Sequence, residues 1–180
     1  QPEKMEPTST SLTCCAYLAT SLDGYIADRG GGIEWLTRLP NPSLSDFGFS
    51  DFMAGVDAVV MGRRTFEQVL SFSEWPYAKK VVVLSSTLSG APPLLASAVQ
   101  VLSGGIDAVL TEAERAGWRR LYVDGGQVVR SFLERDLLDE LVLTQVGVVL
   151  GDGIPLFGPS ARLLDFELVE AEALTSRLVK

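Results

Sequence analysis

The chain contains no histidine among its 180 residues, and this absence removes several kinds of enzyme chemistry at once. Ser-His-Asp and Cys-His catalysis both need an imidazole base, so neither is open to this protein. Any acid or base must be a carboxylate, a tyrosine, a lysine, a cysteine or a bound water. With only two cysteines and no histidine, a zinc site with thiolate or imidazole ligands is not expected, and we predict no metal.

Cysteine itself is scarce, and Cys14 and Cys15 are neighbours in a strand-like run, where adjacent side chains point to opposite faces. We therefore interpret both as small buried thiols and expect no disulfide between them. No apolar run approaches the roughly 18 residues of a membrane span, and the polar N-terminal segment lacks the apolar centre of a signal peptide. The net charge of −8 argues against nucleic acid or an anionic membrane as partner. These absences predict a soluble, cytoplasmic protein.

What is present fits an ordinary globular domain, with 47% hydrophobic and 21% charged residues. Residues 1–11 are rich in Pro, Ser, Thr and Glu, and we interpret them as a flexible tail ahead of a single domain at residues 12–180. Strand-like and helical runs alternate in the middle of the chain, which indicates parallel strands with helical crossovers. The C-terminal third indicates further strands that join this sheet in antiparallel orientation. We predict a three-layer α/β domain with a mixed sheet.

The boundaries of the predicted elements follow from the apolar periodicity. The predicted strands cover residues 13–20, 58–61, 80–84, 98–102, 120–123, 140–149 and 166–174. The predicted helices cover residues 45–54, 65–71, 106–116 and 127–135.

The most informative stretch is residues 57–67, where a buried strand ends in a glycine and two arginines before a helical pattern begins. Gly62 allows backbone to approach a ligand closely. The helix that follows offers free N–H groups and the positive end of its dipole to an anion. Arg63 and Arg64 add charge and planar hydrogen-bonding forks, and Thr65 opens the helix. Taken alone, such a turn is more often a solvated loop.

Two further turns follow strands in the same way. Ser85 and Ser86 come directly after the strand at 80–84, and Gly125 and Gly126 follow the strand at 120–123. Ligands of open α/β sheets gather at the carboxyl ends of parallel strands, so these turns could face one crevice and hold two parts of a phosphorylated ligand. Neither a Gly-x-Gly-x-x-Gly motif after a strand nor a P-loop occurs, so another nucleotide-binding fold is expected.

The order of these motifs resembles the dihydrofolate reductase-like superfamily over residues 13–175. The matching pattern is strand–GRRTFE, strand–LSS, strand–DGG–helix and then DELVLTQVGVVLGDGIPLF. It is most similar to the reductase domain of bacterial riboflavin deaminase-reductases and their stand-alone relatives, which share SLDGYIA at residues 21–27. The resemblance implies a dihydrofolate reductase-like three-layer α/β/α fold with a mixed, mostly parallel sheet, an NADPH cofactor, a small heterocyclic substrate and a homodimer.

The same resemblance implies which residues hold the cofactor. The turn after residues 58–61 would approach the cofactor phosphates, with an arginine fork suited to a 2′-phosphate. The segment after the strand at 80–84 would flank the adenosine ribose, and the glycine pair would lie under the pyrophosphate and nicotinamide. The implied cofactor-binding residues are Gly62, Arg63, Arg64, Thr65, Leu84, Ser85, Ser86, Gly125, Gly126, Gln127 and Val128.

Three residues are implied to act on the substrate. Asp46 lies 16 positions before Gly62, the spacing at which dihydrofolate reductases carry an acidic substrate-binding residue. Thr144 matches the threonine that partners this acid, and Asp23 matches a carboxylate near the substrate end of the cleft in riboflavin-type reductases. Each also has a structural interpretation, because Asp46 could cap a helix, Asp23 could form a turn and Thr144 is ordinary in a strand.

Trp35 follows a run of three glycines, and the resemblance implies a mobile loop there that closes over the nicotinamide. A surface loop with one tryptophan in the core is an equally good interpretation.

The leading hypothesis is an NADPH-dependent oxidoreductase of the 5-amino-6-(5-phosphoribosylamino)uracil reductase type, which would belong to riboflavin biosynthesis. One alternative is a dihydrofolate or dihydropterin reductase, although the segment after Asp46 lacks the pattern of a folate pocket. The other alternative is an NADPH-binding module without turnover.

Overall fold

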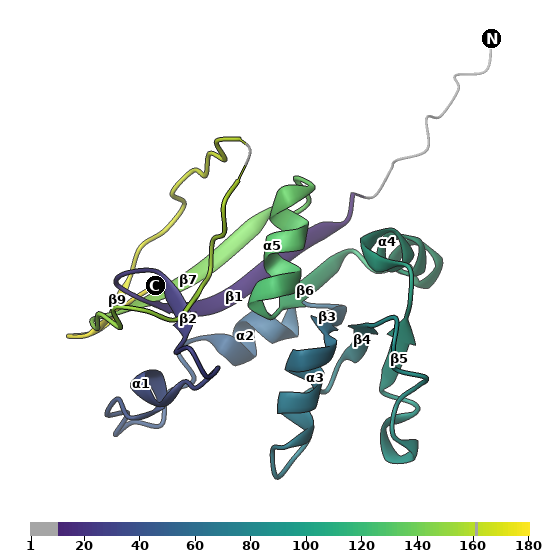
Figure 1. Cartoon of the computed structure of the whole chain (residues 1–180), viewed down its shortest axis with the longest axis horizontal. Helices are drawn as coiled ribbons and strands as arrows, with labels where there is room; N and C mark the ends of the chain where they lie inside the picture. The colour runs from purple at the N-terminus through teal and green to yellow at the C-terminus, as the bar shows by residue number, and fades with distance from the viewer. Residues whose placement is uncertain (1–10, 161) are drawn as a thin grey trace.

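The computed structural model describes residues 11–160 and 162–180. Its core is an eight-stranded sheet with the strand order β5-β4-β3-β6-β1-β7-β10-β9 (Figure 1). The first six strands in this order, from β5 to β7, pair in parallel. Strand β10 then pairs antiparallel with β7, and β9 pairs antiparallel with β10. The strands are β1 (Thr13–Ser21), β3 (Ala58–Gly62), β4 (Lys80–Leu84), β5 (Val99–Leu102), β6 (Arg120–Asp124), β7 (Glu140–Val146), β9 (Ala173–Thr175) and β10 (Leu178–Val179).

The central strands are covered on both faces, which explains their unbroken apolar runs. In β3 every residue from Ala58 to Met61 is fully buried, and so are Val81, Val82 and Val83 of β4. Helices on the two faces bury alternate residues of each strand, because successive side chains in a strand point to opposite sides. In the sequence these strands are therefore marked by continuous apolar runs and not by an alternation of apolar and polar residues.

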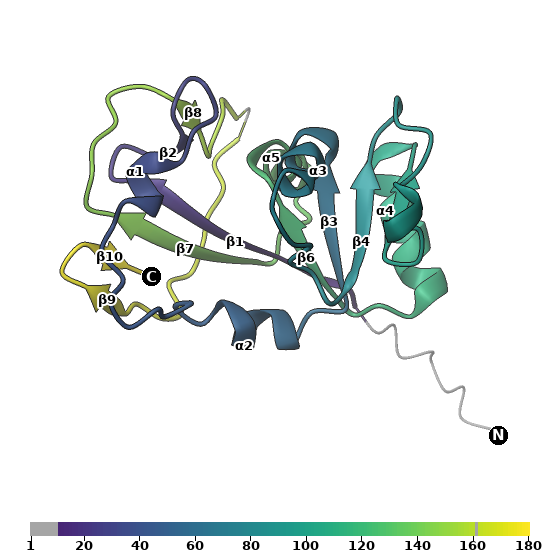
Figure 2. The same ribbon diagram turned by 90° about the horizontal axis from the view of Figure 1, so that it is seen from below.

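Four helices form the outer layers. The helices α4 (Gly105–Ala116) and α5 (Gly126–Glu134) pack on the face that carries Val60, Leu121 and Val123. The helices α2 (Phe49–Ala54) and α3 (Arg63–Leu70) contribute Phe49, Phe52, Met53 and Phe66 to the core on the opposite face. Figure 2 shows α2 lying apart from α3, α4 and α5. The predicted three-layer α/β/α arrangement with a mixed, mostly parallel sheet is confirmed.

Several short elements gave no periodic signal in the sequence. Strands β2 (Tyr25–Ala27) and β8 (Ile154–Pro155) form a separate antiparallel pair, and η1 (Pro93–Leu95) is a short 3-10 helix. Helix α1 (Glu34–Thr37) carries Trp35, which is only 6% exposed and packs with Val146 and Leu178. Trp35 thus anchors its segment in the core, as the second of the two interpretations states.

Three predicted boundaries were wrong. The strand predicted at 166–174 is confined to β9, and no backbone hydrogen bond joins residues 163–171 to the rest of the described chain. Alternating apolar residues marked this segment, but a strand also needs a neighbour to pair with its backbone. The strand predicted at 140–149 ends at Val146, and the helix predicted at 45–54 begins only at Phe49, because residues 44–48 form a turn.

The tail predicted at residues 1–11 lies outside the described residues except for Ser11, which is exposed. Within the described part of the chain, no helix has the length and apolar character needed to cross a membrane.

Candidate functional site

The three glycine- and serine-bearing turns meet at one edge of the sheet, as predicted. Gly62 at the end of β3 is in register with Leu84 at the end of β4, and Met61 is in register with Asp124 at the end of β6. A groove of about 840 Å³ opens there. Its lining residues are Gly62, Arg63, Arg64, Leu84, Ser85, Ser86, Thr87, Gln127, Val128, Arg130, Ser131 and Glu134.

Most of the predicted cofactor-binding residues therefore share this groove. Thr65, Gly125 and Gly126 do not line it, although Gly125 packs against Thr65, and Thr65 and Gly126 are next in sequence to residues that do. The cofactor-binding set predicted from the sequence lacked Thr87, Arg130, Ser131 and Glu134, and the last three follow Gln127 at helical spacing along α5. That periodicity was the signal that could have found them.

The glycine pair allows two helices to approach each other. Gly125 has φ +95°, and a Cβ atom there would overlap the Thr65 side chain of α3. A Cβ atom on Gly126 would overlap the end of the Ile26 side chain, and one on Gly62 would lie 3.3 Å from Val128 Cγ2. Glycine at 125 is thus required by its positive φ and by this contact, whereas a side chain at 126 or 62 would need Ile26 or Val128 to shift. The consequence is that α3 and α5 begin side by side at the groove.

Both helix starts leave backbone donors free. Neither α3 nor α5 has a side chain hydrogen-bonded to its first-turn N–H groups among the described residues. The first N–H groups of a helix have no partner within the helix and carry the positive end of its dipole. Two such ends at one groove favour an anion with more than one phosphate group.

Three arginines add positive charge to the groove, and they differ in how far they are already engaged. Arg63 donates from Nε to Glu67 (2.7 Å) and from a terminal nitrogen to Thr87 Oγ1 (2.6 Å). Arg130 donates to the carbonyl of Pro155 (2.7 Å). Arg64 forms no hydrogen bond or ion pair with any other described residue, so its guanidinium is available to a ligand.

The two serines after β4 have different environments. Ser85 Oγ accepts the backbone N–H groups of Thr87 (3.2 Å) and Leu88 (3.1 Å), so this hydroxyl holds the turn. Ser86 is exposed, and its hydroxyl has no partner within the described chain. Of the pair, Ser86 is the residue whose hydroxyl is not engaged in holding the turn.

Asp46 lies outside the groove, in the turn that leads into α2. Its two carboxylate oxygens accept the backbone N–H groups of Gly48 (3.0 Å) and Ser50 (3.0 Å). Hydrogen bonds from the side chain and backbone of Ser50, with that of Gly48, hold the pKa of Asp46 below its ordinary value. The group is therefore a carboxylate at neutral pH, which suits it to accept a hydrogen bond from a ligand.

Asp23 is occupied by the fold. It accepts the Ser21 hydroxyl (2.6 Å) and the backbone N–H groups of Leu150 (3.1 Å) and Gly151 (2.8 Å). These bonds, with that of Ser21 the largest, lower the pKa of Asp23. The carboxylate thus joins the β1–β2 turn to the segment between β7 and β8, and this geometry does not favour it as a proton donor.

Thr144 is 9% exposed in β7, opposite Ala19 of β1. No hydrogen bond joins it to Asp46 among the described residues. The structure thus places none of Asp46, Asp23 and Thr144 in the groove, whereas it brings most of the cofactor residues together there.

The structure draws attention to a third carboxyl, that of Asp124. Asp124, directly before Gly125, is half-buried and accepts the Tyr77 hydroxyl at 2.7 Å. Burial raises the pKa of Asp124, and burial also raises the pKa of Tyr77. The sequence showed Asp124 only as the first residue of a glycine turn, and Tyr77 lies 47 positions away.

Aromatic side chains cover the sheet between Asp46 and Asp124. Tyr17 of β1 packs against Phe49 and Phe52 of α2 with ring centroids 5.4 and 4.9 Å apart, and Phe52 contacts Tyr122 at 5.2 Å. The α2 face is thus filled by the chain's own rings, consistent with the absence of a folate-type pattern in the sequence.

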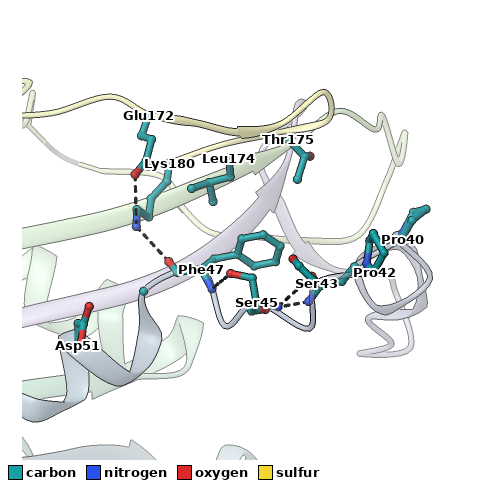
Figure 3. A pocket seen from close by; sticks show the side chains of 12 residues that line it. Pro40, Pro42, Ser43, Ser45, Phe47, Asp51, Glu172, Leu174, Thr175 and Lys180 are labelled. Carbon is teal, nitrogen blue, oxygen red and sulfur yellow. Dashed lines mark hydrogen bonds and ion pairs between the residues drawn. The ribbon is translucent and has the colours of Figure 1, made fainter.

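A second cavity of about 560 Å³ lies between the loop at 40–48 and the β9–β10 edge (Figure 3). Phe47, Leu174 and Lys180 line it, together with polar side chains of the loop. At its floor, the carbonyl oxygen of Phe47 accepts hydrogen bonds from Tyr17 (2.8 Å) and from Lys180 Nζ (3.0 Å).

Comparison with known proteins matches residues 13–180 to the family described as the RibD C-terminal domain. A candidate riboflavin biosynthesis protein from Shewanella sp. PV-4 is 40% identical, with a TM-score of 0.88 over 93% of this chain and 96% of that one. The diaminohydroxyphosphoribosylaminopyrimidine deaminase/5-amino-6-(5-phosphoribosylamino)uracil reductase from Thermotoga maritima is 17% identical, with a TM-score of 0.70 over 96% of this chain and 56% of that one. Dihydrofolate reductase from Enterococcus faecalis, solved with NADP(H), is 18% identical, with a TM-score of 0.61 over 92% and 89% of the two chains.

Proposed function

The chain belongs to the RibD C-terminal domain family, and from this premise we propose that it is an NADPH-dependent reductase of a small heterocycle. The proposed substrate is a ribosylamino-pyrimidine of riboflavin biosynthesis, reduced as by a 5-amino-6-(5-phosphoribosylamino)uracil reductase. The observation that carries the proposal is the groove at the ends of β3, β4 and β6, where two uncapped helix starts meet arginine side chains.

The groove residues fit a phosphorylated dinucleotide. The N–H groups at the starts of α3 and α5 would bind the pyrophosphate, and Gly125 lets these two helix starts lie close together at the groove. Arg63, held beside Thr87 and close to Ser86, would bind the 2′-phosphate that separates NADPH from NADH. When bound, the nicotinamide would supply hydride, and the protein would supply position and charge.

On the substrate side, we assign Asp46 the role of binding the polar edge of the heterocycle. A carboxylate with a lowered pKa accepts hydrogen bonds from ring and amino N–H groups. Thr144 would line the same side of the sheet, and Asp23 would hold the surrounding loops in place through Leu150 and Gly151. A charged group fixed against the reacting ring raises the rate by orienting it.

Two alternatives make different predictions. A dihydrofolate reductase should bind antifolates such as methotrexate or trimethoprim, but the rings of Tyr17, Phe49 and Phe52 fill the α2 face. An NADPH-binding module without turnover would retain the groove and lack a working substrate site. Binding and turnover measured separately distinguish these cases.

The first experiment is titration of the purified protein with NADPH and NADH, followed by quenching of tryptophan fluorescence. We expect micromolar binding of NADPH and much weaker binding of NADH. Absence of binding by both would refute the reductase proposal. Consumption of NADPH is then measured with the ribosylamino-pyrimidine and with dihydrofolate.

Asp46→Asn tests the substrate side, because the variant loses the charge and keeps the shape. We expect kcat to fall by about 10- to 100-fold, because a hydrogen bond to a charged group contributes about 1.5–3 kcal/mol, while the Kd for NADPH stays the same. Asp51→Asn is the matched control, because Asp51 is an exposed carboxylate of α2. A binding module would show unchanged NADPH affinity and no rate in any variant.

We further propose that the protein acts as a cytoplasmic homodimer. Leu163, Leu168 and Val169 are 80–92% exposed in the segment 163–171, whose backbone has no partner within the described chain. An unpaired extended segment with apolar side chains is suited to contact with a second copy. Light scattering on Leu168→Glu and Val169→Glu variants tests this, and an unchanged mass for wild type and variants would refute it.

A further inference from the structure

The carbonyl oxygen of Phe47 is held from two sides by residues distant in sequence. Tyr17 of β1 donates its hydroxyl to it at 2.8 Å, and Lys180, after β10, donates Nζ at 3.0 Å. Figure 3 shows Lys180 reaching across the second cavity to Phe47, with Glu172 on the other side of its ammonium group. Lys180 and Phe47 lie 133 positions apart, so only the fold brings them together.

The backbone at this point is in a conformation that an L-residue avoids. Phe47 has φ +53° and is followed by Gly48 with φ +91°. The left-handed region costs free energy for any residue with a Cβ atom, and a bulky aromatic has no local compensation for it. Such a turn persists when surrounding contacts hold it in place. The two donors to the Phe47 carbonyl are contacts of this kind.

The turn also sets the position of Asp46. The carboxylate accepts the N–H of Gly48, which belongs to the held peptide, and the N–H of Ser50, two residues further along. If the Phe47 peptide rotated, the N–H of Gly48 would rotate with it, because the two atoms belong to the same planar unit. Asp46 would then lose one of the bonds that fix its direction.

Lys180 is itself held firmly. Its backbone exchanges both hydrogen bonds with Glu172 (2.7 and 2.9 Å), and its ammonium lies 4.0 Å from the Glu172 carboxylate. Gly48 fits closely beneath it, since a Cβ atom there would lie 3.1 Å from Lys180 Nζ. The Lys180 side chain therefore connects the β9–β10 edge to the turn that carries Asp46, beside the packing of Phe47 in the cluster that contains Leu178.

We propose that Lys180 and Tyr17 are positioning residues that fix the Asp46 carboxylate by holding the Phe47 carbonyl. The catalytic consequence rests on the proposed function, in which Asp46 binds the substrate. The structural part, the fixed position of Asp46, stands independently of any reaction.

The test compares Lys180→Met, which removes the donor and keeps an unbranched side chain, with Lys180→Arg, which restores a cationic donor. Arg177→Met is the matched control, because it removes an exposed cation from the same β9–β10 edge. Three quantities are measured for each: amide hydrogen exchange at Gly48 and Ser50, the Kd for NADPH, and kcat and KM separately.

In Lys180→Met we expect exchange at Gly48 and Ser50 to be about tenfold faster, the size expected for loss of one hydrogen bond to a charged group. The kcat should fall by a similar factor while the Kd for NADPH stays within about twofold of wild type. Lys180→Arg should recover most of both effects, and Arg177→Met should show neither. Tyr17→Phe should act in the same direction as Lys180→Met.

Unchanged exchange at Gly48 and Ser50 in Lys180→Met would overturn the proposal, whatever happens to the rate. Faster exchange with unchanged kcat and KM in an active enzyme would overturn the catalytic part of the proposal, because substrate turnover would then not need the held turn. Failure of the proposed function looks different: the wild type itself would fail to bind or oxidise NADPH, and amide exchange alone would decide whether Lys180 holds Asp46.

Discussion

Replacing Arg63 by glutamine should remove much of the preference for NADPH over NADH. In the structure the Arg63 guanidinium lies between Glu67 and Thr87, beside the segment proposed to surround the adenosine ribose. A guanidinium hydrogen-bonded to phosphate contributes about 1.5–3 kcal/mol. NADH has a hydroxyl group in place of this phosphate, so the same substitution should leave its affinity nearly unchanged.

The size of the effect depends on what Arg63 loses when it binds phosphate. Its ion pair with Glu67 is about half exposed on both sides, with side-chain exposures of 47% and 50%, so it contributes at most about 1 kcal/mol. The net gain from the phosphate is then about 1–2 kcal/mol. Arg63→Gln should therefore weaken NADPH binding by about 5- to 30-fold.

Removing the neighbouring carboxylate should have the opposite effect on NADPH binding. Glu67→Gln removes a competitor for Arg63 and a negative charge near the phosphate, so NADPH should bind up to about fivefold more tightly. Arg119→Gln is the control, because Arg119 is an exposed arginine that precedes the amino end of β6, at the other end of this strand from the groove.

Fluorescence titrations of each variant with both dinucleotides provide the assay. If Arg63→Gln weakened NADPH and NADH equally, Arg63 would not contact the 2′-phosphate. If Glu67→Gln weakened NADPH binding, Glu67 would orient Arg63 rather than compete for it, and the reasoning above would be refuted.

Three further predictions concern the turns around the site. Gly125→Ala should lower the free energy of unfolding by about 2–4 kcal/mol, because residue 125 has a positive φ and a Cβ atom there would overlap Thr65. Urea unfolding of the two single variants and of Gly125→Ala/Thr65→Ala should show a coupling energy of about 1–3 kcal/mol, and strict additivity would contradict the packing argument. Asp23 has a lowered pKa in the folded state, so its carboxylate stabilises the fold at pH 7 and this contribution is lost as the pH falls below about 4. Asp23→Asn should therefore lower the urea midpoint at pH 7, and an equally large difference from wild type at pH 3 would refute this. Asp124 has a raised pKa, so wild-type stability should fall relative to Asp124→Asn as the pH rises above about 4, and a difference independent of pH would argue against burial of the charge.

The sequence alone predicted the sheet and the groove well, for a physical reason. Strands β3, β4 and β6 are buried on both faces, so their apolar runs are unbroken and their ends are sharp. The residues that line the groove follow those ends directly along the chain. Parallel strands bring their carboxyl ends to one edge, so local order in the sequence was enough to predict which turns meet.

The candidate catalytic carboxylates could not be predicted in the same way. The residue type and spacing identified Asp46 and Asp23, but their availability depends on partners contributed by the turn conformation and by Leu150, 127 positions from Asp23. Asp124 became notable only when Tyr77 was found against it. Hydrogen bonds between distant residues leave no periodic trace in the sequence.

The sequence by itself determined the central strands, the helices that cover them and the turns of the groove, because these depend on burial patterns and backbone preferences within a few residues. Only the tertiary structure decided that the backbone of residues 163–171 has no hydrogen-bond partner in the described chain, that Trp35 is held in the core, and that Lys180 holds the turn of Asp46. Each of these depends on which distant segments come into contact, and contact across the fold is set by the packing of the whole chain.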